Sequence, residues 1–446
     1  MDAVIHHSPP LRGTLTPPPD KAICQRAVLI AALAQGDTVI RPWPAADDCQ
    51  RVLQLVQALG VVVKRSAQDL TIQGRGAEGL QAPTQDLFCG ESATTFRLAA
   101  GLLAGQPFTS RLSAGPSLSR RPMRRIVEPL SEMGARLQGT VSSSGQAELV
   151  PPLTIQGRRP LRAIRYEMRL ASAQVKSAIL LAGLSADGRT TIVEPHQTRD
   201  HTERMLRHVG VRLECSGPEV SVEPGALASP GTVSLPGDFS SAAFFLVAAA
   251  CVPGSRLTLQ EVGLNPTRIG LLGILERMGA SVHCSVNKER WEPRGTLVVE
   301  AQALRGTIVE PAEVPSVIDE LAILMVAAAC ARGTTHFRGI GELRVKETDR
   351  IQSMVNGLRR LGVDVHLEPP DTVEITGGSL RGAVVESAGD HRTAMSLAVA
   401  GLAAEGRTIV RGAECVAKSF PEFFDQLRLA TSFSTVKTVD NASTLC

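Results

Sequence analysis

An apolar, alanine-rich segment followed by glycine and a β-prone stretch recurs six times along the chain. The glycines that follow the six apolar segments are Gly36, Gly105, Gly188, Gly254, Gly333 and Gly406. They are separated by 69, 83, 66, 79 and 73 residues, an average of 74. A period of this length indicates that one supersecondary unit is repeated six times.

A second segment alternates with the first and is amphipathic. It ends in an apolar residue and glycine before another strand-like stretch; its copies are QALGVVV, SEMGARL, RHVGVRL, ERMGASV and RRLGVDV, and the sixth repeat lacks it. Each repeat is therefore predicted to run helix, strand, helix, strand, strand. The glycines are predicted to adopt left-handed conformations after the helices. The stretches DLTIQG, GTLVVEA and PDTVEI are predicted closing strands.

The first helix of each repeat is apolar on nearly all sides, which is typical of a buried helix. One repeat cannot bury such a helix alone, but three repeats could share a core. We therefore predict an α/β (α+β) fold with two similar domains of three repeats each. A propeller or solenoid is the alternative, and helices buried on all sides favour a globule over either. Aromatic residues make up 3% of the chain, so aliphatic side chains should build the cores.

Composition excludes several classes of protein. The longest apolar runs, Ala242–Val252 and Leu321–Ala331, are each 11 residues, whereas a membrane-spanning helix needs about 20. Nine scattered cysteines without a CxxC pair argue against a disulfide framework or a zinc site. The net charge of +3 with few aromatics disfavours a nucleic-acid binder. We expect a cytoplasmic protein without a targeting peptide, and a disordered tail over Thr431–Cys446.

Ionisable residues gather at the predicted helix starts, where unpaired N–H groups and the helix dipole favour anions. Ser, Thr and Asp are ordinary N-caps, which accounts for Ser240 and Ser241. Lysine and arginine oppose the dipole unless an anion binds, so these cations predict a substrate with more than one phosphate or carboxylate. Asp319, Glu320 and Glu347 could hold its hydroxyls or exchange protons. The cations include Lys21, Arg26, Arg97, Arg121, Lys176, Arg199, Lys346, Arg350, Arg392 and Lys418.

Nine strings along the chain resemble the ordered motifs of the 5-enolpyruvylshikimate-3-phosphate synthase family. They are DKAICQRA, GESATTFRL, RRPM, SAQVKSAILLAGL, TRDHTERM, VIDELAI, LRVKETDR, DHRTAM and AKSFPEF, and they extend from residue 20 to about 425. RVKETDR and SAQVKSA are specific to the family. The GES-x-TT, TRDHTE and IDE variants are more similar to a divergent bacterial, glyphosate-insensitive-like branch.

The resemblance implies two domains of three βαβαββ units, of the inverse α/β barrel type, joined by a double hinge. One domain would be 21–236 and the other 1–20 plus 237–446. The family transfers the enolpyruvyl group of phosphoenolpyruvate to the 5-hydroxyl of shikimate 3-phosphate and releases phosphate, a step of chorismate and aromatic amino-acid biosynthesis. No metal or organic cofactor is implied. We expect a monomer that has no nucleic-acid or membrane partner.

The resemblance also assigns residues by position. Asp319 and Glu347 would move protons, with Lys21 and Lys418 assisting. Shikimate 3-phosphate would be held by Lys21, Ala22, Arg26, Ser172, Ala173, Gln174, Arg199, Asp319 and Lys346. Phosphoenolpyruvate would be held by Lys21, Ala93, Arg121, Gln174, Arg350, Arg392 and Lys418.

Two positions depart from the family pattern. Ala22 replaces the usual serine, which removes a hydroxyl expected on the substrate phosphate and about 1–2 kcal/mol of binding. Ala93 replaces the usual glycine near the phosphoenolpyruvate phosphate, where the longer herbicide glyphosate also binds. A Cβ there should exclude glyphosate more than the substrate, so we expect reduced glyphosate sensitivity.

Two other functions fit much of the same pattern. The sister enolpyruvyl transferase that acts on UDP-N-acetylglucosamine shares fold and chemistry but usually carries a cysteine on a mobile loop. The corresponding stretch here, LSAGPSLSRRPM, has none. A non-catalytic homologue that binds a phosphorylated metabolite is suggested by Ala22, whereas Asp319, Glu347 and Lys346 argue against it.

Overall fold

Six mixed sheets and the helices packed against them make up the computed structural model, which describes residues 1–66, 68–142, 148–287, 291–431 and 435–439. The chain divides into two compact units. Unit 1 comprises Met1–Pro18 and Pro236–Cys446, and unit 2 comprises Pro19–Leu235. The boundaries expected from the sequence differ from these by one or two residues.

Unit 2 contains three sheets. Its elements are α1 (Lys21–Leu33), β3 (Ala34–Arg41), α2 (Asp47–Ala58), β4 (Val62–Arg65), β5 (Leu70–Arg75), β6 (Leu87–Phe88), α3 (Ala93–Ala104), β7 (Thr109–Ser113), η1 (Leu118–Arg120), α4 (Arg124–Glu132), β8 (Arg136–Val141), β9 (Leu149–Gln156), β10 (Arg165–Glu167), α5 (Ala173–Gly183), β11 (Thr190–Val193), α6 (His201–His208), β12 (Leu213–Ser216), β13 (Glu219–Val222), β14 (Leu227–Ala228) and β15 (Thr232–Ser234). The sheet orders are β14-β3-β5-β4 with β15 also on β3, β6-β7-β9-β8, and β10-β11-β13-β12.

Unit 1 also contains three sheets. Its elements are β1 (Asp2–His6), β2 (Arg12–Leu15), α7 (Phe239–Cys251), β16 (Arg256–Gly263), α8 (Gly270–Arg277), β17 (Ser281–Asn287), β18 (Arg294–Glu300), β19 (Ile308–Val309), α9 (Val314–Val317), α10 (Leu321–Cys330), β20 (Thr334–Phe337), η2 (Gly341–Val345), α11 (Arg350–Arg360), β21 (Asp364–Glu368), β22 (Thr372–Thr376), β23 (Val384–Glu386), α12 (His391–Ala403), β24 (Arg407–Arg411), η3 (Ala413–Lys418), α13 (Phe423–Ala430) and β25 (Val436–Val439). The sheet orders are β17-β18-β16-β2, β19-β20-β22-β21, and β23-β24-β1-β25.

The predicted order of helix, strand, helix, strand, strand is confirmed in the first five repeats. Three repeats take strands from distant parts of the chain. In unit 2, β14 and β15 pair parallel to β3. In unit 1, β2 pairs parallel to β16, and β1 lies between β24 and β25. Each unit is therefore closed by strands far in sequence from the sheets they join.

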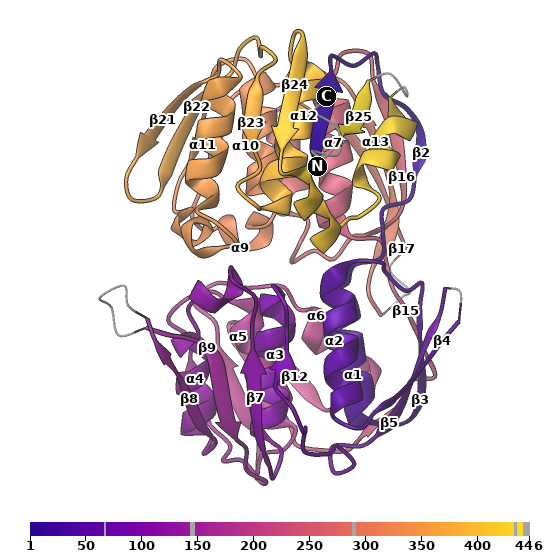
Figure 1. Cartoon of the computed structure of the whole chain (residues 1–446), viewed down its shortest axis with the longest axis vertical. Helices are drawn as coiled ribbons and strands as arrows, with labels where there is room; N and C mark the ends of the chain where they lie inside the picture. Colours follow the sequence, from indigo (N-terminus) through magenta and orange to yellow (C-terminus); the bar gives the residue numbers. More distant parts are fainter. Residues whose placement is uncertain (67, 143–147, 288–290, 432–434, 440–446) are drawn as a thin grey trace, which may run out of the picture. The chain divides into compact units, whose positions relative to one another are not determined.

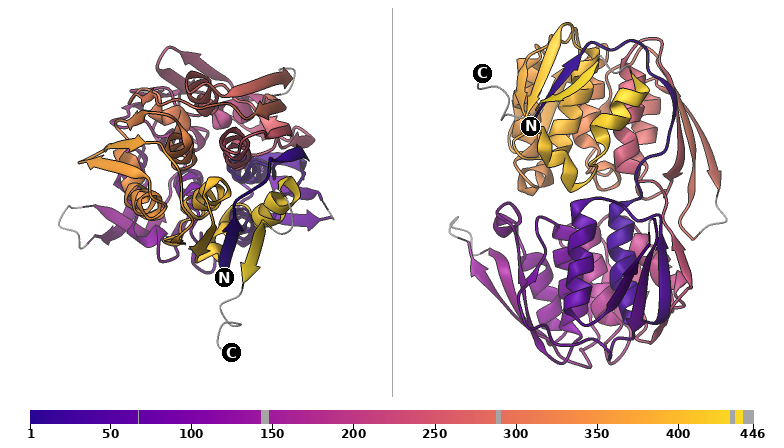
Figure 2. Two further views of the ribbon diagram at one scale, coloured as in Figure 1. Left: turned by 90° about the horizontal axis from the view of Figure 1, so that it is seen from above. Right: turned by 45° about the vertical axis from the view of Figure 1, so that its right-hand side comes forward.

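The first helix of every repeat is buried, as its all-round apolar pattern predicts. Nearly all residues of α1, α3, α5, α7, α10 and α12 are inaccessible to solvent. Figures 1 and 2 show these helices on the inner side of each unit, with strands outside them. The second helices α2, α4, α6, α8 and α11 are buried on one face only.

The helix-following glycines conform to the prediction with two exceptions. Among the six that follow the apolar helices, Gly105 has φ −84° and Gly188 is also outside the left-handed region. Gly36, Gly254, Gly333 and Gly406 have φ between 75° and 99°. The five glycines after the amphipathic helices, Gly60, Gly134, Gly210, Gly279 and Gly362, are all left-handed, with φ from 84° to 99°.

The end of the chain and the phenylalanines correct two expectations. Val436–Val439 forms β25, so this part of the tail is not disordered; residues 432–434 and 440–446 lie outside the described residues. Five phenylalanines cluster where α13 packs against α7, with neighbouring ring centroids 5.1–6.1 Å apart. They are Phe244, Phe245, Phe420, Phe423 and Phe424. Together with the separately buried Phe96, Phe239 and Phe337, they show that aromatic side chains contribute to cores that are otherwise mainly aliphatic.

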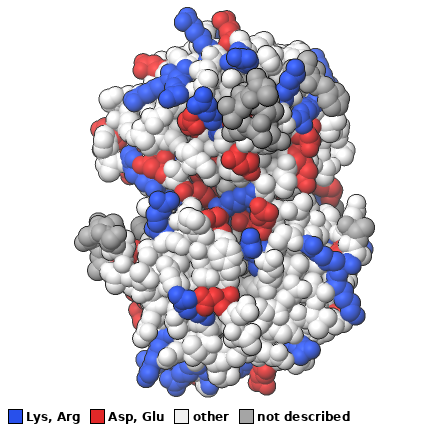
Figure 3. Space-filling model, in the orientation of Figure 1, with Lys and Arg blue, Asp and Glu red and all other residues white. Residues whose placement is uncertain are grey.

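The distribution of charged residues on the surface and the lengths of the helices are as the near-balanced charge and the short apolar runs of the sequence predict. Figure 3 shows Lys and Arg interspersed with Asp and Glu over the face it draws. Within the described ranges, every helix is too short or too polar to cross a bilayer.

Candidate functional site

The N-terminal turns of α1, α3 and α5 are joined by side-chain hydrogen bonds in unit 2. Gln25 Nε2 of α1 donates to Ser92 Oγ, the N-cap of α3, at 2.9 Å. Gln174 Nε2 of α5 donates to Thr94 Oγ1 of α3 at 2.9 Å. Arg26 Nη2 of α1 donates to Ser177 Oγ of α5 at 3.3 Å. The structure therefore brings together three helix starts, at Lys21, Ala93 and Ala173, that are distant in sequence.

Arg26 is held rigidly at this junction. Its side chain is 4% exposed, and its Nε donates to Thr202 Oγ1 of α6 at 2.8 Å. Its Nη1 donates to the carbonyl oxygen of Ala22 at 2.8 Å. A guanidinium bound on three sides does not need to reorganise when an anion approaches, which is the condition for strong electrostatic binding.

Lys21 begins α1 and lies beside an acid that the sequence reasoning did not single out. Its Nζ donates to Asp48 Oδ2 of α2 at 2.8 Å. The two side chains are 15% and 8% exposed. Asp48 follows another aspartate in the first turn of α2 and looks like an ordinary helix-start acid in the sequence, so only the packing of α1 on α2 identifies it as the partner of Lys21.

Gln174 connects the predicted site residues of α3 and α5. Its Oε1 accepts from Arg97 Nη1 at 2.6 Å. Ser172 is the N-cap of α5, and its hydroxyl accepts from the Val175 amide. Ala93 is the first residue of α3 and is 5% exposed. Arg97 was noted in the sequence only as a cation near a helix start, whereas the structure places it in direct contact with Gln174.

Arg121 and Arg199 lie in the segments that lead into α4 and α6. Arg121 follows η1 and is buried, and Arg199 is half-buried two residues before α6. Their places in a shared site with Arg26 and Gln174 stay predictions.

Lys176 belongs to a buried ion cluster instead of an open anion site. Its Nζ lies 2.9 Å from Glu194 Oε2 and 2.6 Å from Glu203 Oε1, and all three side chains are at most 5% exposed. Burial alone would lower the pKa of Lys176, but the charges of Glu203 and Glu194 outweigh burial and raise it. The cluster ties α5 to α6 and to the segment that carries Arg199.

In unit 1, Arg350 is surrounded by acids at the start of α11. Its Nε donates to Asp390 Oδ2 at 2.9 Å, and its Nη2 donates to Glu347 Oε2 at 2.6 Å. Lys418 Nζ donates to the other oxygen of Glu347 at 3.3 Å. Burial would lower the pKa of Arg350, but Asp390, Glu347 and Asp319 raise it. Glu347 is thus a half-buried carboxylate that bridges two cations.

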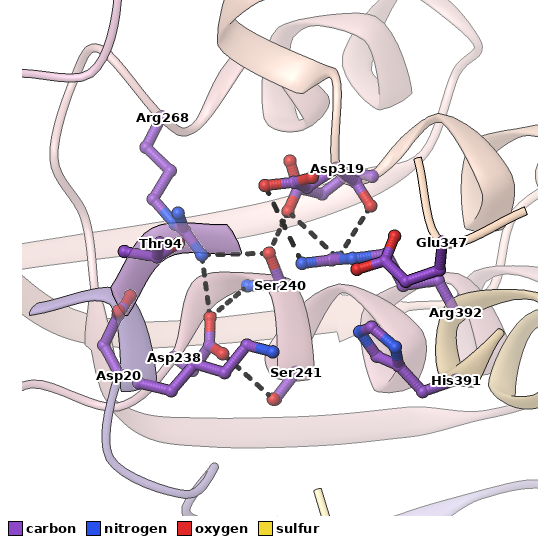
Figure 4. Close-up of polar contacts among 12 residues, drawn as sticks. Asp20, Thr94, Asp238, Ser240, Ser241, Arg268, Asp319, Glu347, His391 and Arg392 are labelled. Atoms are coloured by element: carbon purple, nitrogen blue, oxygen red, sulfur yellow. Dashed lines mark hydrogen bonds and ion pairs between the residues drawn. The ribbon is translucent and has the colours of Figure 1, made fainter. Parts of the chain in front are cut away.

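Arg392 occupies the second residue of α12 and contacts the predicted proton-transfer residue Asp319. Its Nη1 donates to the Asp319 carbonyl oxygen at 2.7 Å, and its Nη2 lies 3.8 Å from Asp319 Oδ2. Asp390 caps α12 by accepting from the Arg392 amide. Figure 4 shows Arg392 lying alongside Asp319, with Glu347 and His391 nearby. Lys346 follows η2 next to Glu347 in sequence and is half-buried.

Two sequence interpretations of the helix starts are wrong. Ser240 and Ser241 are not the caps of α7, because Asp238 occupies that position and accepts from the Ser240 amide. Nor are the cations uncompensated at the helix starts. Lys21, Lys176, Arg350 and Arg392 each lie against one or more carboxylates. Lys418, at the end of η3, also lies against one. The carboxylates offset the unfavourable dipole interaction, so the cations are stable there even without a bound anion.

Comparisons with known proteins agree with one another. A family model described as EPSP synthase (3-phosphoshikimate 1-carboxyvinyltransferase) matches residues 5–427. A relative named 3-phosphoshikimate 1-carboxyvinyltransferase from Pelotomaculum thermopropionicum is 46% identical over 430 residues, covering 96% of this chain and 98% of its own. A relative of the same name from Geobacter sulfurreducens is 47% identical over 420 residues, covering 94% and 96%.

Solved structures show the same likeness. An EPSP synthase from Acinetobacter baumannii superposes with a TM-score of 0.86 at 39% identity, covering 98% of this chain and 99% of its own. The enolpyruvyl transferase NikO from Streptomyces tendae superposes with a TM-score of 0.76 at 18% identity over 98% of both chains. The second likeness concerns the fold alone.

Proposed function

This chain belongs to the EPSP synthase family, and we propose that it is a 3-phosphoshikimate 1-carboxyvinyltransferase. In the proposed reaction, the 5-hydroxyl of shikimate 3-phosphate loses its proton and attacks C2 of phosphoenolpyruvate while C3 takes up a proton. The resulting tetrahedral intermediate loses phosphate from C2 and a proton from C3, which forms the enol ether product. The site must therefore bind two anionic substrates, take a proton from the 5-hydroxyl, and both deliver a proton to C3 and remove one from it.

The observation that carries this proposal is the pairing of proton-transfer acids with cations in unit 1. Glu347 lies between Arg350 and Lys418, and Asp319 lies against Arg392. A carboxylate beside cations is stabilised in its ionised form, and in that form it can accept a proton as a general base.

The substrate roles follow from the same chemistry. Arg350 and Arg392 carry planar guanidinium groups, which suit the carboxylate and phosphate of phosphoenolpyruvate. In unit 2, Arg26 and the half-buried Ser172 and Gln174 support the proposed binding of shikimate 3-phosphate.

The activity is tested by measuring phosphate release with both substrates and with each alone. We expect release only when both are present. Glu347→Gln should lower kcat by roughly 10²–10⁴ because it removes an acid–base group. Glu386→Gln, which changes an exposed acid of unit 1 paired with Arg411, is the matched control and should leave kcat unchanged. Release with UDP-N-acetylglucosamine in place of shikimate 3-phosphate, or no release at all, would overturn the proposal.

Reduced sensitivity to glyphosate is part of the proposal and rests on Ala93. Because this residue is buried at the first turn of α3, its methyl group has little room to move away from a longer ligand. Ala93→Gly should tighten glyphosate inhibition about 10-fold or more, the usual effect of one methyl group in a closed pocket. Ala104→Gly, at the other end of α3, controls for the loss of helix propensity. Equal inhibition constants for the natural enzyme and Ala93→Gly would sink the idea.

We further propose that the enzyme acts in the cytoplasm as a monomer. Light scattering during size-exclusion chromatography should give the mass of one chain, 47.3 kDa. A mass twice as large would show a dimer.

A further inference from the structure

A buried chain of polar contacts in unit 1 leads from Arg268 to the predicted phosphoenolpyruvate residue Arg392. Arg268 lies before α8 and was not singled out in the sequence. Its Nη2 donates to Asp238 Oδ1 and to Ser240 Oγ, each at 2.9 Å. The Ser240 hydroxyl in turn donates to Glu320 Oε1. Glu320 Oε1 lies 3.9 Å from Arg392 Nη1.

The residues that lead from Arg268 to Arg392 are almost completely buried. Arg268, Asp238 and Ser240 are 3% exposed and Glu320 is 0% exposed. The Asp238 amide donates to the Pro18 carbonyl oxygen at 2.7 Å. Asp238, which accepts from Arg268, is therefore anchored to the main chain. Arg268 and Ser240 bond to one another and between them contact Asp238 and Glu320, so these groups can hold Arg392 in place through Glu320. Figure 4 shows Arg268 and Asp238 on one side of Ser240, with Arg392 and Asp319 on the other.

The hydrogen bonds run in one direction, from Arg268 through Ser240 to Glu320. A serine hydroxyl has a single proton to donate. Because Arg268 donates to Ser240 Oγ, that proton is available for Glu320, and Glu320 Oε1 accepts it. The same Glu320 oxygen lies 3.9 Å from Arg392 Nη1, which donates to the Asp319 carbonyl oxygen. Glu320 therefore connects the Ser240 hydroxyl to the Arg392 guanidinium.

We propose that Arg268, Ser240 and Glu320 are positioning residues that orient Arg392 for phosphoenolpyruvate. The kinetic effects of this positioning rest on the proposed function, whereas the orientation of Arg392 does not depend on it. Arg392 also contacts Asp319, which is a predicted proton-transfer residue. The same series of contacts therefore positions the Arg392 guanidinium against the Asp319 backbone. None of the three residues reacts or contacts substrate in this scheme.

Ser240→Ala tests the proposal with the smallest change, because it removes only the hydroxyl between Arg268 and Glu320. Ser241→Ala is the matched control: Ser241 is the next residue of α7, is equally buried, and contacts Asp238 but not Glu320. Ser240→Thr keeps the hydroxyl and should restore the wild-type behaviour. If Ser240→Ala does not fold, Glu320→Gln serves as the second variant, since it removes the charge and keeps the shape.

We expect Ser240→Ala to raise KM for phosphoenolpyruvate about tenfold with kcat changed less than about threefold, since uniform binding is lost. Ser241→Ala should leave both constants within about twofold of the natural enzyme, because it removes only a weak contact with Asp238 that does not lead to Glu320. In crystal structures the Arg392 Nη1 to Asp319 carbonyl distance, 2.7 Å in the natural chain, should lengthen only when the Ser240 hydroxyl is absent.

Equal KM values in the two alanine variants, or an unmoved Arg392 in Ser240→Ala, would overturn the positioning role. Failure of the proposed function is separate from this result: it would appear as absent phosphate release by the natural enzyme, while the crystallographic distance still reports on Arg392.

Discussion

Ala22 lies where the family resemblance leads us to expect a serine. It is the second residue of α1, is half-buried, and its carbonyl oxygen accepts from Arg26 Nη1. The backbone of the turn is thus held in place, and only the hydroxyl of the usual serine is missing. A hydroxyl added there would enter an already ordered helix start beside Lys21.

Ala22→Ser should therefore improve binding of shikimate 3-phosphate. One hydrogen bond to a charged phosphate contributes about 1–2 kcal/mol, so KM for this substrate should fall roughly tenfold. The KM for phosphoenolpyruvate is the internal control and should stay within about twofold, because the change touches one substrate only. Unchanged KM values for both substrates would mean that Ala22 does not face shikimate 3-phosphate.

Close packing of strands on helix ends explains several glycines at the scale of the elements. A Cβ at Gly74, in β5, would lie 2.2 Å from the carbonyl oxygens of Ala31 and Ala34 at the end of α1. Gly157, after β9, would meet the Gln106 carbonyl oxygen at 2.1 Å. Both glycines lie in the same sequence, LTIQGR. The repeated glycine is needed because backbone meets backbone there, and neither side can move away.

Gly74→Ala should lower the free energy of unfolding by about 1–3 kcal/mol or more, the usual effect of overpacking a rigid site. Gly273→Ala is the matched control, because Gly273 is exposed in α8 and an added Cβ would meet no atom within 4 Å. It should raise stability by about 0.5–1 kcal/mol through helix propensity. Urea denaturation measures both, and equal effects would contradict the packing argument.

The ion cluster of Lys176 makes the contact between α5 and α6 depend on pH. Because its pKa in the folded state is raised, the stabilisation is fully present below the unfolded pKa of about 10.4. It is lost as the pH rises through the still higher folded value. The stability of the natural protein should therefore decline in strongly alkaline solution as Lys176 loses its proton.

Lys176→Met should lower the unfolding free energy at pH 7 by about 3–5 kcal/mol, because Glu194 and Glu203 are left buried without their cation. Its stability should also decline less above pH 10 than that of the natural protein. Lys64→Met, at an exposed position of β4, is the control and should change neither property. The measurement is urea denaturation at a series of pH values. If Lys176→Met proves as stable as the natural protein at pH 7, the cluster does not hold α5 against α6.

At the scale of the whole molecule, the two units differ in how their chains close. All strands of unit 2 come from one continuous segment, with β14 and β15 completing the sheet of β3. Unit 1 needs β1 and β2 from the first 18 residues, and β1 lies in the middle of its sheet. Without β1, β24 and β25 would lose their shared partner.

We therefore expect the fragment 19–235 to fold alone and the fragment 236–446 to fold only when a peptide of residues 1–18 is supplied. Circular dichroism during urea denaturation should show a cooperative transition for the first fragment, as for other single domains. The second should gain such a transition on addition of the peptide. Cooperative unfolding of 236–446 without the peptide would show that β1 and β2 are dispensable.

Much of the fold could be predicted because its signals are local. The all-round apolar pattern of Leu321–Cys330 and the helix-following Gly362 each describe a short segment, and the structure agrees with both. Similarly, the motifs around Ser172 and Glu347 gave site residues that the structure places at or just before helix starts. Ser240 was misassigned because Asp238, two residues earlier, is an equally good cap and only the packing selects it.

The sequence by itself determined six repeats, their buried helices, the order of their elements and the family. Only the tertiary structure decided which distant strands close each unit, which acid neutralises each cation, and that Arg268 is tied to Arg392 through Ser240 and Glu320. The physical reason is that periodicity and caps are short-range properties of a chain, whereas a strand pairing or a buried ion pair joins residues that become neighbours only on folding.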